Sequence, residues 1–219
     1  GLLHKNMDEP EQAISILERT IEIEGQSQAI DSTVLAEAHF LLGKCFSSIG
    51  DKVRSLHSYK SAIKMRPNFT NALNNLGVLF LENGNYKNAL LQFEIGLSHN
   101  KKSVELNHNR GSALFGLKDF DRALASFEAA LEIDPKYSAS FAGLANALFE
   151  IGSYQKSIKY YKLALADDPA SETCRVNLAD AFVSTSNLKA SAECLFEGVN
   201  WNSGSHRLAS YSKYADRRI

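Results

Sequence analysis

The stretch VELNHNRGSALFGLKDFDRALASFEAALEIDPKY, residues 104–137, decides the fold because its residue types recur elsewhere in the chain at the same offsets. Pro135 and Pro169 lie 34 residues apart, and Pro67 precedes Pro135 by twice that distance. Three glycines repeat the same spacing: Gly43, Gly77 and Gly111. A period of 34 residues predicts helix-turn-helix units that stack on one another and bury a continuous core.

Within each 34-residue unit, counted from residues 36, 70, 104, 138 and 172, certain positions hold one kind of residue. Positions 8, 20 and 27 are small, as is required where the two helices of a hairpin cross closely. Position 8 holds Gly43, Gly77, Gly111, Ala145 and Ala179. Position 24 is large and is expected to fill the space between hairpins; it holds Tyr59, Phe93, Phe127, Tyr161 and Leu195. The turn glycines Gly50, Gly84 and Gly152 are predicted to adopt a positive φ.

These fixed positions resemble the tetratricopeptide repeat family, and the resemblance covers nearly the whole chain. It implies an all-α fold, a right-handed superhelical solenoid of helix-turn-helix repeats. The repeats are predicted at residues 36–69, 70–103, 104–137, 138–171 and 172–203. Lys101 in place of the family's proline and Lys52 in place of an aromatic residue depart from the pattern.

Both ends of the chain depart from this register. Residues 1–35 are expected to hold the second helix of a partial repeat, with Ala13 at position 20, and then an insertion. The insertion, residues 25–35, is predicted as a surface loop, and an extension of the next helix from Asp31 or Ser32 is the alternative. Because Gly1 then falls inside a first helix, we expect a longer parent protein. Residues 204–219 are predicted to form a capping helix with a polar outer face.

The composition argues against several classes of function. The 24 Lys and Arg residues nearly cancel the 25 Asp and Glu residues, whereas a nucleic-acid binder concentrates positive charge. Three widely separated cysteines predict neither a disulfide framework nor a zinc site. No apolar run approaches the ~18 residues of a membrane span, and no signal peptide opens the chain, so we expect an intracellular protein without membrane insertion. No phosphate loop, zinc-protease, serine-hydrolase or calcium-loop motif is present, which predicts no enzyme, cofactor or metal.

The first helices of such repeats line the inner groove of the solenoid, where position 6 points. Position 6 holds Leu41, Asn75, Asn109, Gly143 and Asn177. This series resembles the asparagine ladder of O-GlcNAc transferase-type arrays, in which side-chain amides bond to the backbone of an extended peptide. A carboxamide suits that task because it offers two donors and an acceptor. Asn74 and Asn146, at positions 5 and 9, extend the ladder.

Apolar residues are predicted to supply the rest of the groove contacts. The full predicted partner-binding set is Asn74, Asn75, Val78, Leu81, His108, Asn109, Phe115, Asn146, Phe149 and Asn177. A second family pattern, the carboxylate clamp of chaperone-binding arrays, does not fit. Its flanking positions around Asn109 hold Asn74, Val78, Ala139 and Gly143, and none of them is a cation that would pair with a terminal carboxylate.

The sequence thus predicts a protein-protein interaction scaffold that binds a partner peptide or helix in its concave groove, as a subunit of a multiprotein complex. Two alternatives stay open. One is a structural subunit that is held through its ends and convex face. The other is the regulatory portion of a larger enzyme, such as a glycosyltransferase.

Overall fold

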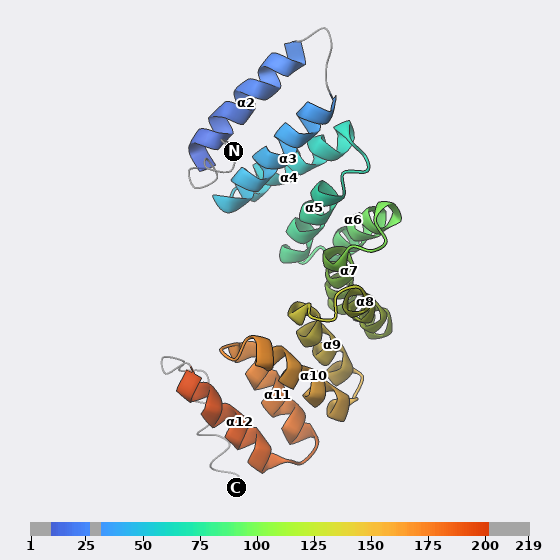
Figure 1. Cartoon of the computed structure of the whole chain (residues 1–219), viewed down its shortest axis with the longest axis vertical. Helices are drawn as coiled ribbons and strands as arrows, with labels where there is room; N and C mark the ends of the chain where they lie inside the picture. The colour runs from blue at the N-terminus through green and yellow to red at the C-terminus, as the bar shows by residue number, and fades with distance from the viewer. Residues whose placement is uncertain (1–9, 27–31, 202–219) are drawn as a thin grey trace. The chain divides into compact units, whose positions relative to one another are not determined.

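The computed structural model describes residues 10–26 and 32–201, and within these ranges every regular element is an α-helix (Figure 1). In chain order the helices are α2 (Pro10–Gln26), α3 (Ser32–Ser48), α4 (Lys52–Met65), α5 (Thr70–Glu82), α6 (Tyr86–His99), α7 (Val104–Gly116), α8 (Phe120–Ile133), α9 (Ser138–Glu150), α10 (Tyr154–Asp167), α11 (Glu172–Ser184) and α12 (Leu188–Trp201). The predicted all-α fold of paired helices is confirmed.

The 34-residue period of the sequence is the length of one helix pair. First helices begin at Thr70, Val104, Ser138 and Glu172, which are 34 residues apart. Second helices begin with the same spacing at Lys52, Tyr86, Phe120, Tyr154 and Leu188. Each first helix packs on the second helix that follows it, so one pair is the repeating unit of the solenoid.

The insertion before the first complete repeat is helical where the structure describes it. Helix α2 continues to Gln26, and α3 begins at Ser32, four residues before the repeat position from which the other first helices start. The loop prediction for this segment is therefore wrong at residues 32–35, where the alternative, an extended helix, is correct. Burial explains the extension, because Leu35 and Ala36 are 5% and 0% exposed. Residues 27–31 and the predicted capping helix at 204–219 lie outside the described residues.

The chain divides into two compact units, and the first comprises residues 1–102 with helices α2 to α6. Its core begins where Ala13 and Leu17 of α2 pack against α3. The α3 residues in that cluster are Ala38, Leu42, Cys45 and Phe46. Helices α3 and α4 form one pair, α5 and α6 the next, and Tyr59 of α4 packs against Leu76 and Leu79 of α5.

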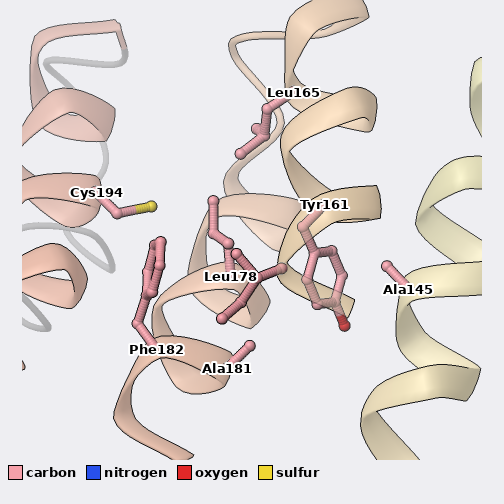
Figure 2. Packing of buried hydrophobic residues seen from close by; sticks show 8 residues of the cluster. Ala145, Tyr161, Leu165, Leu178, Ala181, Phe182 and Cys194 are labelled. Atoms are coloured by element: carbon pink, nitrogen blue, oxygen red, sulfur yellow. The ribbon is translucent and has the colours of Figure 1, made fainter. Parts of the chain in front are cut away.

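The second unit, residues 103–219, contains helices α7 to α12. One of its buried clusters joins four successive helices (Figure 2). The ring of Tyr161 on α10 lies between Ala145 of α9 and Leu178 of α11, while Cys194 of α12 faces Phe182 of α11. Helices α9 and α11 therefore both pack on α10 and contact each other.

The turn inside every pair has the same left-handed backbone. Gly50, Gly84 and Gly152 have φ of +79°, +71° and +79°, as predicted for turn glycines. Lys118 and Ser186 occupy the equivalent position in their repeats and have φ of 62° and 59°. A side chain in this region is disfavoured by ~1 kcal/mol or more, so these two turns are strained where the other three are not.

None of the described helices combines the length and apolar character that crossing a membrane requires.

Candidate functional site

The aromatic residue at position 24 sets the spacing of each helix pair. A Cβ atom added to Gly43 would lie 2.6 Å from Cε1 of Tyr59, and one added to Gly111 would lie 2.7 Å from Cε1 of Phe127. Real Cβ atoms do not approach other heavy atoms so closely. The first helix therefore packs closely against the aromatic ring of its own pair, which leaves no room for a side chain at these glycines.

Tyrosines at position 24 also bond to asparagines of neighbouring first helices. Asn75 donates from Nδ2 to the Tyr59 hydroxyl at 3.2 Å. In the second unit the Tyr161 hydroxyl donates to Oδ1 of Asn146 at 2.6 Å, and Asn177 donates from Nδ2 to the same oxygen at 3.0 Å. Burial raises the pKa of both tyrosines, so both hydroxyls stay protonated. These amides thus join successive helix pairs, a role that the ladder prediction did not include.

The break in the ladder at Gly143 has a packing cause. A Cβ atom at this position would lie 2.6 Å from Cε1 and Cζ of Phe127. Phe127 is 1% exposed, so its ring has no room to move away. An asparagine at residue 143 would collide with this ring, and phenylalanine has no hydroxyl with which to bond to it.

His108, predicted to face the groove, lies in the contact between helices α7 and α9. Its Nδ1 is 3.1 Å from the hydroxyl of Ser140, which is 0% exposed. Its ring centroid is 5.4 Å from those of Phe127 and Tyr137. Burial lowers the pKa of His108 to about 4, so the imidazole is neutral at pH 7. Its part in the structure is packing and one hydrogen bond, and it lines none of the pockets described below.

Four of the ten predicted residues come together around one pocket in the second unit, with a volume of about 340 Å³. Helices α7, α9, α10 and α11 contribute its walls, and we call it the acidic pocket. It is lined by Phe115, Asn146, Phe149, Glu150, Tyr161, Asn177 and Asp180. The pocket therefore combines two aromatic rings, two amides that are linked to a tyrosine hydroxyl, and two carboxylates.

The first unit has a pocket at the equivalent place, with a volume of about 330 Å³. This upstream pocket is lined by Lys44, Ser47, Ser48, Tyr59, Asn75, Val78, Leu79 and Glu82. Positions 9, 12, 13 and 24 of one repeat and positions 6 and 9 of the next line both pockets. They are therefore the same site in two different repeats, with different chemistry, and Asn75 and Val78 are the predicted residues that line this one.

The remaining predicted residues, Asn74, Leu81 and Asn109, line neither pocket. All ten predicted residues are half-buried, which leaves each of them partly accessible. Sequence reasoning missed Glu150, Asp180 and Tyr161. Glu150 and Asp180 occupy positions 13 and 9, both on the groove side, so reading these positions for charge would have found them.

A third and larger hollow of about 410 Å³ lies among α10, α11 and α12. Its most unusual residue is Arg175, whose side chain is only 6% exposed. The guanidinium donates to the backbone oxygens of Pro169 and Cys194 at 2.7 and 3.3 Å and pairs with Glu197 at 3.6 Å. Arg175 is thus bonded within the fold, where it joins α11 to α12 and to the turn before α11.

Comparisons with known proteins agree with this geometry. Models of the tetratricopeptide repeat match residues 36–69, 58–90 and 108–172. No curated protein matches the sequence significantly.

Three of the solved structures that are similar to this chain illustrate the shared fold. YrrB, described as a TPR protein with an unusual peptide-binding site, is 19% identical with a TM-score of 0.68, over 90% of this chain and 97% of its own. TTC0263, a TPR protein of Thermus thermophilus, is 18% identical with a TM-score of 0.67, and the match covers 83% of this chain and 99% of TTC0263. The APC/C hetero-tetramer Cut9–Hcn1 gives 14% identity and a TM-score of 0.74, over 97% of this chain and 45% of the matched chain. The chain belongs to the tetratricopeptide repeat family, whose members are in general protein-interaction scaffolds.

Proposed function

We propose that this chain is a scaffold that binds an extended segment of a partner protein on the first-helix face of residues 103–201, over the acidic pocket. The observation that carries the proposal is the convergence of Phe115, Asn146, Phe149 and Asn177 around one hollow. Their repeat positions and residue types predict that they face the groove, and they come from three different first helices.

The pocket offers the two kinds of contact that an extended segment needs. The half-buried rings of Phe115 and Phe149 supply apolar area, and an aromatic residue in a pocket is a frequent centre of binding energy. Asn146 accepts both of its described hydrogen bonds at Oδ1, which leaves its amide hydrogens for a peptide carbonyl. Asn177 donates to Asn146 and leaves its own oxygen for a peptide N–H.

The bonds to Tyr161 favour binding because they fix these amides before a ligand arrives. Ordering a side chain on binding costs ~0.5–1.5 kcal/mol, and a side chain that the fold already orders avoids most of that cost. Tyr161 is 1% exposed and lies in the core of the second unit, so the position of its hydroxyl is set by packing.

A selection from a random peptide library on the folded chain tests the proposal. Selected peptides are synthesised with a fluorescent label, and their affinities for wild type, Phe149→Ala and Phe196→Ala are measured by anisotropy. Phe196 is a matched control because it is also a partly exposed phenylalanine, 47% exposed, but belongs to the second helix α12 and lines none of the three pockets. We expect Phe149→Ala to weaken binding about tenfold or more and Phe196→Ala to leave it unchanged.

The same two variants separate the proposal from its structural alternative. If the chain instead engages partners through the outer face of its second helices, Phe196→Ala weakens binding and Phe149→Ala does not. That result would contradict the proposed site. Circular dichroism of each variant confirms that helix content is retained before the affinities are compared.

A further inference from the structure

We infer that the acidic pocket selects an arginine or lysine side chain of the bound segment. This inference rests on the function proposed above and adds the chemistry of the residue that the pocket receives. The hollow of about 340 Å³ is at the small end of the range for ligand pockets, and its size suits one side chain of a longer segment.

The two carboxylates of the pocket have no basic partner in the described part of the chain. Glu150 ends helix α9 and Asp180 lies in α11, and both line the hollow. Among the described residues, neither carboxylate takes part in an ion pair. Partial desolvation raises the pKa of Asp180, so its negative charge is less stable there than in water. A cation that enters the pocket relieves this unfavourable state, whereas a neutral residue does not.

The other groups of the pocket also match a basic side chain. A guanidinium carries five N–H donors and no acceptor, so it needs acceptors around it. The pocket provides the carboxylate oxygens and Oδ1 of Asn177, whose Nδ2 already donates to Asn146. The rings of Phe115 and Phe149 offer flat surfaces on which a guanidinium stacks favourably.

The upstream pocket does not share this chemistry. At the place of Asn146 it has Lys44, and at the place of Asp180 it has Val78. Its single carboxylate, Glu82, pairs with Lys52 at 3.3 Å. The carboxylate of that pocket is therefore already paired with a lysine of the chain, and Glu82 serves as a control for the loss of a carboxylate in the equivalent pocket.

The test uses peptides selected from a random library on the full chain and synthetic analogues of the tightest one. We expect the aligned selected peptides to share an arginine or lysine at one position. Replacing this residue by citrulline keeps the shape of arginine and removes its charge, and replacing it by glutamate reverses the charge. The citrulline analogue should bind wild type about two- to fivefold more weakly, as expected for a partly exposed charge pair.

Variants of the chain assign the preference to the pocket. The double variant Glu150→Gln/Asp180→Asn should bind the basic peptide and its citrulline analogue equally. The double variant Glu150→Lys/Asp180→Lys should prefer the glutamate analogue. Glu82→Gln, in the upstream pocket, should keep the wild-type preference. Glu150 and Asp180 are exposed, so we expect all these variants to fold, and circular dichroism checks this.

Each other outcome has a defined meaning. Selected peptides without a recurring basic residue, or with equal affinity for the citrulline analogue, overturn the inferred selectivity and leave the proposed function standing. A basic preference that persists in both double variants overturns its assignment to this pocket. A library that yields no binding peptide overturns the proposed function as well.

Discussion

Protonation of His108 should destabilise the fold, because the native site disfavours a charged imidazole. The folded-state pKa of this histidine is lowered from 6.5 to about 4 by burial against Phe127, Tyr137 and Ser140. A lowered pKa for a base means that the unfolded chain takes up the proton first as the pH falls. The contribution of this site is therefore complete above about pH 6.5 and is lost progressively between pH 6.5 and pH 4.

The size of the effect follows from the displacement of the pKa. One pKa unit corresponds to ~1.4 kcal/mol, so the shift is worth at most about 3 kcal/mol at pH values below 4. Between pH 7 and pH 5, where only part of the range is crossed, the loss is about 2 kcal/mol. This is a large fraction of the stability of an ordinary domain.

The assay compares wild type with His108→Gln, which is neutral at both pH values and keeps a hydrogen-bonding group near Ser140. Urea unfolding is followed by far-ultraviolet circular dichroism at pH 7 and pH 5. Between pH 7 and pH 5, the unfolding free energy of wild type should fall by about 2 kcal/mol more than that of His108→Gln. His99→Gln, at an exposed histidine that ends α6, controls for the loss of one histidine. A wild-type minus His108→Gln difference that stays constant between the two pH values would refute the reasoning.

Four further substitutions test the turn geometry, the packing and the proposed site. Lys118→Gly and Ser186→Gly should each stabilise the chain by ~0.5–1 kcal/mol in urea unfolding, because glycine tolerates the positive φ found there; a loss of stability would contradict the strained turns. Gly143→Asn, which restores the ladder residue, should destabilise the second unit by ~1–3 kcal/mol through its clash with Phe127, and unchanged thermal unfolding would disprove that packing. Tyr161→Phe should lower stability by ~1 kcal/mol and weaken binding of a selected peptide, because Asn146 loses a hydrogen bond. An unaltered peptide affinity would show that Tyr161 does not contribute to the site.

Most of the fold was predictable because the repeat constrains each position in the same way five times. A glycine at position 8 faces the aromatic ring at position 24 in its own pair, and this contact requires one small and one large residue. The turn glycines were predictable because only glycine adopts a positive φ at little cost. The start of α3 was not, because residues 32–35 precede the repeated pattern and the 34-residue register carries no information about them.

The site was predictable only in part, because a repeat position fixes the direction of a side chain but not its partner. Asn146 and Asn177 do line a pocket, but the oxygen of Asn146 accepts hydrogen bonds from both Tyr161 and Asn177. The repeat pattern predicts only a packing role for the residue at position 24. The residue type at position 24 was the available signal. Tyr59 precedes Asn75 and Tyr161 precedes Asn177, whereas phenylalanines precede Asn109 and Gly143, so a tyrosine at position 24 signals an asparagine that shares a hydrogen-bond network with its hydroxyl. His108 was assigned to the groove by position, but its burial depends on Phe127 and Tyr137 together.

Site-specific photocrosslinking tests the central proposal most directly. The photoreactive residue p-benzoylphenylalanine is placed at position 149 or, in a separate protein, at position 196 of the full chain. Each protein is irradiated with the tightest library-selected peptide, and the crosslinked residues are identified by mass spectrometry. Binding over the acidic pocket predicts that the peptide crosslinks from position 149, at or next to its basic residue, and not from position 196. Efficient crosslinking from position 196 with none from position 149, under conditions where the peptide is bound, would contradict it.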